Sequence, residues 1–180
     1  MYISYNEACA KGCSTLEQDL RLCENAGFDY IEIRINMLKE YLKSRTIQEL
    51  VSFFKTSRIR PHAINAIYLY PEFLGECDRD DRRTALMEEF TLACEAGSAI
   101  GSHHIIIVPP LQREPDGGPY IGKWEDTRRE CVRILKELSK FAEPYDMNLC
   151  FELVGFDRSS VRSIEEADAI VRAVERKNVG

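Results

Sequence analysis

The chain alternates five times between a β-rich run and a stretch of helical periodicity, and this alternation constrains the fold more than any other feature. The predicted strands cover residues 2–7, 30–35, 61–67, 104–109 and 148–154. The fourth run contains three successive isoleucines and is apolar throughout, as expected of a strand covered on both faces. Strands that alternate with helices of this length pair in parallel through right-handed crossovers. We therefore predict one α/β domain, residues 1–180.

Local end signals place the helices between these strands. A long helix is predicted to stop near Gly101, and another runs from about Trp124 until Pro144 ends it. We expect a sixth strand to begin at Asn178. Three further helices are predicted to begin with a capping box, formed by the pairs Ser14 and Glu17, Thr46 and Glu49, and Ser163 and Glu166.

Two architectures are compatible with five such units. One is an open, flavodoxin-like sheet, and the other is a (β/α)8 TIM barrel, typically about 250 residues long, truncated after about five βα units. A flavodoxin-like protein grips phosphate with the loop after its first strand, but residues 8–15 have neither P-loop nor G-x-G-x-x-G spacing. Inward carboxylates on the second and fifth strands suit a barrel mouth better. We therefore predict the truncated barrel.

The polar residues near the carboxyl ends of the predicted strands are the candidates for function, because ligands bind at that end in both architectures. They are Asn6, Glu7, Glu32, Arg34, Asn65 and Glu152. Period-two alternation places Glu32 and Arg34 on one face of their strand, so a structural ion pair and a substrate contact both remain open. Glu152 lies among apolar residues without a basic neighbour in its strand, which favours a metal-binding or proton-transfer role.

The three histidines lie at the opposite end. His62 follows the proline that opens the third strand, and His103 and His104 precede or open the fourth. In a TIM barrel, residues at the amino-terminal ends of the strands contribute to stability and not to catalysis. We therefore expect structural roles for all three and do not assign them to a metal.

The composition of the chain excludes some classes of binding partner. A net charge of −6 and a pI near 5.2 argue against a nucleic-acid partner, and no apolar run is long enough for a membrane span. The seven cysteines contain no C-x-x-C pair and are expected to be reduced thiols, so we expect a cytoplasmic protein. The loops at residues 68–74 and 111–122 could form a lid over the mouth, or their aromatic residues could pack on neighbouring helices.

Several segments of the sequence resemble those of a known protein family. They are Tyr5-Asn6-Glu7-Ala8, Gly27-Phe28-Asp29-Tyr30-Ile31-Glu32-Ile33-Arg34, Ile64-Asn65-Ala66, Phe151-Glu152-Leu153-Val154-Gly155 and Asn178-Val179-Gly180. Together they resemble the xylose-isomerase-like TIM-barrel family of sugar isomerases and epimerases, and within it the inosose isomerases of inositol catabolism. The resemblance covers essentially the whole chain in order.

The resemblance implies a divalent-metal site, for Mn²⁺, Zn²⁺ or Mg²⁺, at the barrel mouth. Its ligands in the family are a strand-five glutamate, an aspartate, a histidine and a late glutamate, of which only the first has a counterpart here, Glu152. The other three would follow Gly180, so the 180-residue chain alone is expected to be inactive. The implied reaction isomerises a keto-polyol or keto-sugar by proton transfer through an enediolate, with Glu152 as metal ligand and candidate acid or base.

In this interpretation Asn6, Glu32, Arg34 and Asn65 orient the hydroxyls of a small-molecule polyol, and association into a homo-oligomer remains open. A dehydratase acting on inosose or dehydroshikimate, on the same barrel, begins with the same proton abstraction and is the first alternative. An apurinic endonuclease shares the barrel and the metal, but the acidic composition opposes it. A non-catalytic five-stranded α/β module is the third.

Overall fold

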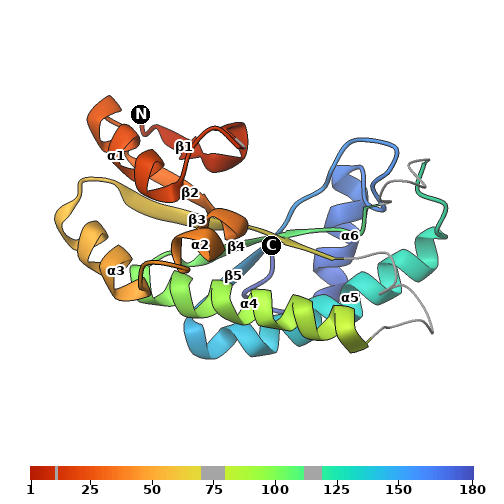
Figure 1. The fold of residues 1–180 in the computed structure, drawn as a ribbon. Helices are drawn as coiled ribbons and strands as arrows, with labels where there is room; N and C mark the ends of the chain where they lie inside the picture. Colours follow the sequence, from red (N-terminus) through yellow and green to blue (C-terminus); the bar gives the residue numbers. More distant parts are fainter. Residues whose placement is uncertain (11, 70–79, 112–118) are drawn as a thin grey trace.

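The computed structural model describes residues 1–10, 12–69, 80–111 and 119–180 (Figure 1). Its strands form one parallel sheet in the order β1-β2-β3-β4-β5. A flavodoxin-like sheet would have the order 2-1-3-4-5, whereas consecutive neighbours are what a barrel wall requires. The barrel prediction is therefore confirmed, and the open-sheet alternative is wrong. The strands are β1 Ser4–Asn6, β2 Tyr30–Arg34, β3 Arg60–Tyr68, β4 His104–Val108 and β5 Asn148–Phe151.

Helices connect these strands and pack on one another outside the sheet. Phe90 and Phe141 join the two longest helices, with ring centroids 5.8 Å apart. The α-helices are α1 Leu16–Ala26, α2 Ile35–Tyr41, α3 Ile47–Thr56, α4 Asp80–Ile100, α5 Trp124–Ala142 and α6 Ile164–Val174. Within the described ranges, the short 3-10 helices η1 Glu7–Ala10 and η3 Glu143–Tyr145 follow β1 and α5. No helix within the described ranges is both long and apolar enough to cross a membrane.

The sheet has a covered face and a more open face. In β2, Ile31 and Ile33 are completely buried, whereas Glu32 and Arg34, which alternate with them, are only half-buried. The covered face carries the hydrophobic core that the helices complete, and its burial is the main stabilising contribution to the fold. The more open face is the inner wall of the barrel, and it carries the polar side chains.

The last residues of the chain pair with β5. The backbone N–H of Leu149 donates to the carbonyl of Asn178 at 2.8 Å, and that of Phe151 donates to Gly180 at 2.7 Å. The bridge between Leu149 and Val179 is parallel, so residues 178–180 take the position of a sixth strand. This pairing agrees with a sixth strand beginning at Asn178, but residues 178–180 form only an isolated bridge and the sheet of the described residues has five strands.

The capping boxes show how local sequence sets the helix starts. Those of α3 and α6 form as predicted, at Thr46 and Ser163. The predicted box of Ser14 and Glu17 is wrong by one residue, because Thr15 caps α1 together with Gln18. Ser14 and Thr15 both carry a hydroxyl, so the sequence signal fits either register.

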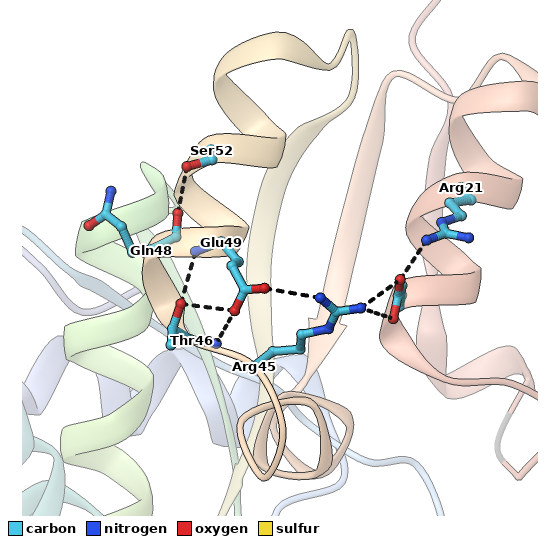
Figure 2. A network of polar contacts seen from close by, with 7 residues as sticks. Arg21, Arg45, Thr46, Gln48, Glu49 and Ser52 are labelled. Atoms are coloured by element: carbon cyan, nitrogen blue, oxygen red, sulfur yellow. Dashed lines mark hydrogen bonds and ion pairs between the residues drawn. The ribbon is translucent and has the colours of Figure 1, made fainter.

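Arg45 ties the starts of α1 and α3 together (Figure 2). Its guanidinium donates to Glu49 of α3 at 3.0 Å and to Glu17 of α1 at 3.3 Å. Glu49 also accepts from the backbone N–H of Thr46 at 2.8 Å, which completes the capping box. This network lies on the exposed outside of the wall.

Three local features differ from the predicted pattern. Helix α2 was not expected and begins directly after β2, where Arg34 caps it without a side-chain hydrogen bond. Strand β1 ends at Asn6, so Glu7 lies in η1 and not in the strand. Strand β5 ends at Phe151, which places Glu152 just beyond the strand.

Candidate metal and substrate site at the carboxyl ends of the strands

Glu32 is at the centre of a polar cluster on the inner wall. Its Oε1 accepts a hydrogen bond from Asn6 Nδ2 at 2.5 Å and another from Asn65 Nδ2 at 2.6 Å. Asn6 is opposite Glu32 in the register of β1 and β2, and Asn65 lies one strand further along, in β3. Asn6 Oδ1 in turn accepts from the backbone N–H of Ala8 at 2.8 Å, which fixes the amide. Three predicted site residues from three strands therefore meet.

Arg34 does not pair with Glu32. Within the part of the chain that the structure describes, its guanidinium makes no hydrogen bond or ion pair. It lines a cavity of about 230 Å³ at the ends of β2 and β3, together with the polar residues Asn36, Asn65, Tyr68 and Glu89. Of the two alternatives left open by the sequence, the ion pair is therefore wrong. A guanidinium that makes no hydrogen bond with the described residues, in a cavity lined by amide, phenol and carboxylate groups, suits a ligand rich in oxygen.

Glu152 lies at the carboxyl end of β5, where its backbone N–H donates to the carbonyl of Ile107 at 3.0 Å. Burial raises the pKa of the Glu152 carboxyl above its ordinary value, and the nearby charge of Glu32 raises it further. The same two causes, in the same order, raise the pKa of the Cys150 thiol, which shares the inner face with Glu152. Glu32 and Glu152 therefore contribute negative charge to one region of the barrel mouth.

A bound cation would stabilise the proximity of Glu32 and Glu152, because its positive charge would offset the repulsion between the two carboxylates. Carboxylate oxygens are ligands of Mg²⁺ and Mn²⁺ and also occur in zinc sites. Across residues 1–10, 12–69, 80–111 and 119–180, however, no three His, Cys, Asp or Glu side chains are grouped closely enough to hold a metal ion. The described residues therefore do not form a complete metal site by themselves.

Two buried carboxyls lie behind this cluster, and only one was noted in the sequence. Glu7 is 1% exposed and Asp19, on α1, is 3% exposed. Glu7 Oε2 accepts from the backbone N–H of Arg34 at 2.7 Å. The signal for Asp19 was its spacing, since it shares the buried helix face with Leu16, Leu20 and Cys23.

The histidines lie where the sequence places them, at the amino ends of the strands. His104 opens β4, and His62 lies near the start of β3. Their rings continue a row of aromatic contacts across the sheet, with centroid distances of 5.7 Å between Tyr2 and Tyr30, 5.7 Å between Tyr30 and His62, and 6.1 Å between His62 and His104. We call these four residues the ring row. His103 lies outside the row and contacts the backbone carbonyl of Asp146 at 3.1 Å.

The predicted lid falls partly outside the described residues, which omit 70–79 and 112–118. Of the first loop, Tyr68 is exposed and Leu69 is buried. The loops after β4 and β5 are joined, because the backbone N–H of Tyr120 donates to Asp157 at 2.8 Å and that of Ser160 to Pro110 at 3.0 Å. These bonds fix the described parts of the two loops to each other.

A parallel sheet in barrel order with carboxylates at its mouth occurs in many TIM-barrel proteins, and the sequence shows to which family the chain belongs. Residues 20–180 match the family described as xylose isomerase-like TIM barrel. The chain belongs to this family.

Among its relatives, proteins named inosose isomerase are similar along the whole chain. Those of Bacillus velezensis and Halalkalibacterium halodurans are each 36% identical over 182 aligned residues, which cover 100% of this chain. The alignments cover 61% and 60% of those proteins, so the chain spans less than two thirds of the length of the curated relatives it matches.

Solved structures agree with this assignment. A crystal structure of the IolI protein with a bound zinc atom superposes with a TM-score of 0.85 at 35% identity, covering 100% of this chain and 61% of that one. A D-psicose 3-epimerase crystallised with D-fructose has a TM-score of 0.72 at 17% identity, covering 99% of this chain and 62% of that one. The second likeness shows the fold alone.

Proposed function

We propose that the protein is a divalent-metal-dependent isomerase of keto-polyols, acting on a cyclitol ketone such as an inosose. The observation that carries the proposal is Glu152 at the carboxyl end of β5, next to the charge of Glu32, on a chain 36% identical to inosose isomerases over its whole length. The zinc bound to the similar IolI protein supports a metal but leaves its identity open among Zn²⁺, Mn²⁺ and Mg²⁺.

Glu152 would hold the metal from β5. Further ligands would come from the part of the relatives' length that this chain does not span, since the described residues contain no group of three ligands. When bound, a divalent cation supplies positive charge that stabilises the negative charge developing on a substrate oxygen. This stabilisation typically amounts to several kcal/mol. This requirement makes the 180 residues one wall of a larger site.

The remaining residues would bind and orient the substrate. Glu32 Oε1 already accepts from two amides, so its Oε2 is the oxygen that would accept a substrate hydroxyl. Asn6 and Asn65 would act chiefly by holding Glu32 in place. Arg34 would donate to an oxygen of the substrate in the adjoining cavity.

The reaction itself moves one proton between neighbouring carbons. A carboxylate removes the proton from the hydroxyl-bearing carbon next to the carbonyl, and a proton is returned to the former carbonyl carbon. The proton of the neighbouring hydroxyl passes to the former carbonyl oxygen, so that carbonyl and hydroxyl exchange places. Glu152 is the described carboxylate that would take this proton. Loss of a β-hydroxyl after the same first step would instead give a dehydratase, which needs the same abstraction and a different second step.

The test follows hydrogen exchange in the full-length protein. With an inosose, a divalent metal and deuterated water, NMR should show deuterium entering the carbon next to the carbonyl, together with the isomeric ketone. Glu152→Gln should lower the exchange rate by about 10²- to 10⁴-fold, the usual contribution of a general acid or base. Mn²⁺ binding, followed by electron paramagnetic resonance, should weaken in the same variant.

Glu165→Gln is the matched control, because Glu165 is an exposed glutamate on α6. Its exchange rate and Mn²⁺ affinity should equal those of the wild type. A dehydrated, ultraviolet-absorbing product would overturn the isomerase in favour of the lyase. Unchanged exchange in Glu152→Gln would remove Glu152 from the mechanism.

A further inference from the structure

Glu7 and Asp19 form a buried pair of carboxyls that the proposed reaction does not use. The two side chains are 1% and 3% exposed, and each keeps one oxygen, Glu7 Oε1 and Asp19 Oδ2, without a hydrogen-bond donor among the described residues. Buried carboxylate oxygens without donors are costly. The two side chains interact with each other, and two carboxyl oxygens can form a hydrogen bond only if one of them carries a proton.

The groups around the pair favour retention of that proton. Among the described residues, Tyr5 on β1 and Cys23 on α1 are the neutral titratable side chains that interact with it, and neither supplies a positive charge at neutral pH. Arg34, at the end of β2, is the one nearby cation among the described residues.

Burial is the first cause that raises the pKa of Glu7, to about 8 from an ordinary 4.5. The hydrogen bond from the backbone N–H of Arg34 opposes this rise, while the hydrogen bond and the charge of Asp19 add to it. The direction agrees with the geometry, since both indicate an acid that stays protonated at neutral pH.

We propose that Glu7 and Asp19 share a single proton across their two unpaired oxygens, and that the pair positions the Arg34 backbone at the barrel mouth. Glu7 is suited to both parts, because its Oε1 faces the shared proton while its Oε2 accepts the Arg34 N–H at 2.7 Å. Proton sharing lets the two carboxyls bury together with one negative charge instead of two. The β1–η1 corner and α1 thereby fix the point where β2 passes into α2.

Proton sharing needs no substrate for its test, so it fails or holds independently of the proposed function; only the consequence for Arg34 as a substrate contact rests on that function. Infrared spectra of the wild type at neutral pH should contain the carbonyl band of a protonated carboxylic acid. That band should disappear as the pH is raised through about 8. Over the same range, NMR should show the amide proton of Arg34 titrating.

Glu7→Gln is the decisive variant, because its amide can donate to Asp19 while its oxygen still accepts from Arg34. It should remain folded, lack the acid band and show an Arg34 amide that no longer titrates. Glu7→Ala, which loses both bonds, should shift the Arg34 amide and be less stable than Glu7→Gln at every pH. Glu88→Gln, on the exposed side of α4, should keep the wild-type spectra.

Stability adds a third measurement. Between the ordinary and the raised pKa the folded protein binds one proton more than the unfolded chain, so stability falls as the pH rises. Relative to Glu7→Gln, the unfolding constant of the wild type should rise roughly tenfold per pH unit over that range. Parallel profiles of wild type and Glu7→Gln, or a wild-type spectrum without an acid band at neutral pH, would overturn the proposal. The wild-type spectra decide the matter even if a variant fails to fold.

Discussion

At the carboxyl ends of β1, β2 and β3 a carboxylate and two amides are joined by hydrogen bonds of 2.5 and 2.6 Å, whereas at the amino ends of the same sheet the ring row makes contacts of 5.7–6.1 Å. Both sets lie on the inner wall. In β2, Tyr30 and Glu32 are two residues apart and share a face, yet one belongs to the ring row and the other to the polar cluster.

The difference indicates that the two ends of the inner wall have different roles, packing at the amino ends of the strands and ligand binding at the carboxyl ends. Ring contacts of this kind, two of them edge-to-face and one tilted, are modest, so they can fill the amino-terminal end of the barrel by packing alone. Carboxylates and amides placed by strand register are directional, and they keep unused oxygens for a substrate or a cation. The comparison predicts that the polar cluster contributes more per residue to stability than the ring row does. It also predicts that the chemistry belongs to the carboxyl ends of the strands, where Glu152 lies, whereas the ring row contributes only packing.

The largest expected effect on stability is at the polar cluster. Asn65→Ala removes one of two donors to the half-buried Glu32 carboxylate and should lower the free energy of unfolding by about 1.5–3 kcal/mol, the usual range for hydrogen bonds to charged groups. Urea denaturation followed by circular dichroism measures it. Asn25→Ala, at an exposed position of α1, is the control and should cost nothing. A loss below about 0.5 kcal/mol for Asn65→Ala would mean that water replaces the amide without penalty.

A smaller effect is expected in the ring row. Tyr30→Leu removes the contacts with Tyr2 and His62, and a double-mutant cycle with His62→Leu should give a coupling of about 0.5–1.5 kcal/mol. Mn²⁺ binding and hydrogen exchange should be unchanged in both single variants. Loss of metal binding in His62→Leu would break the comparison, because it would give the amino ends of the strands a role in chemistry.

The sequence predicted the order and direction of the wall because each βα unit carries its own local signals. The capping boxes of α3 and α6 depend on four residues each and were found as predicted. Helix α2 was missed because it begins without a capping side chain, so nothing in the sequence marks the passage from Arg34 to Ile35. The one-residue error at α1 arose because Ser14 and Thr15 are equally good candidates for a cap.

The sequence predicts which residues belong to the site better than it predicts the hydrogen bonds between them. Asn6, Glu32 and Asn65 were expected at the strand ends, but Arg34 was considered as the partner of Glu32. Residues two apart in a strand are separated by roughly 6.6 Å along it, whereas neighbouring strands are only about 4.8 Å apart. Cross-strand amides therefore reach the carboxylate first, and strand register, which no single segment of sequence encodes, decides the pairing.

The smallest expected effect on stability is at the Arg45 network of Figure 2. This network tests whether the number of hydrogen bonds or their burial determines how much they stabilise the protein. Glu49 accepts from the backbone and hydroxyl of Thr46 and from Arg45, so it has at least as many donors as Glu32. The backbone bond is the first cause that lowers the pKa of Glu49, and the bond from Arg45 is the second. The network nevertheless lies in water, which competes for every one of these bonds.

Arg45→Met should therefore destabilise the protein less than Asn65→Ala or the ring-row variants, and high salt should abolish the difference from wild type. The cost of Asn65→Ala, a neutral donor to a half-buried acceptor, should change little with salt. Thermal unfolding at low and high ionic strength measures both. If the two variants respond equally to salt, the Glu32 cluster is as open to solvent as the outside of the barrel, and the strand ends owe their rigidity to the backbone and not to the amides.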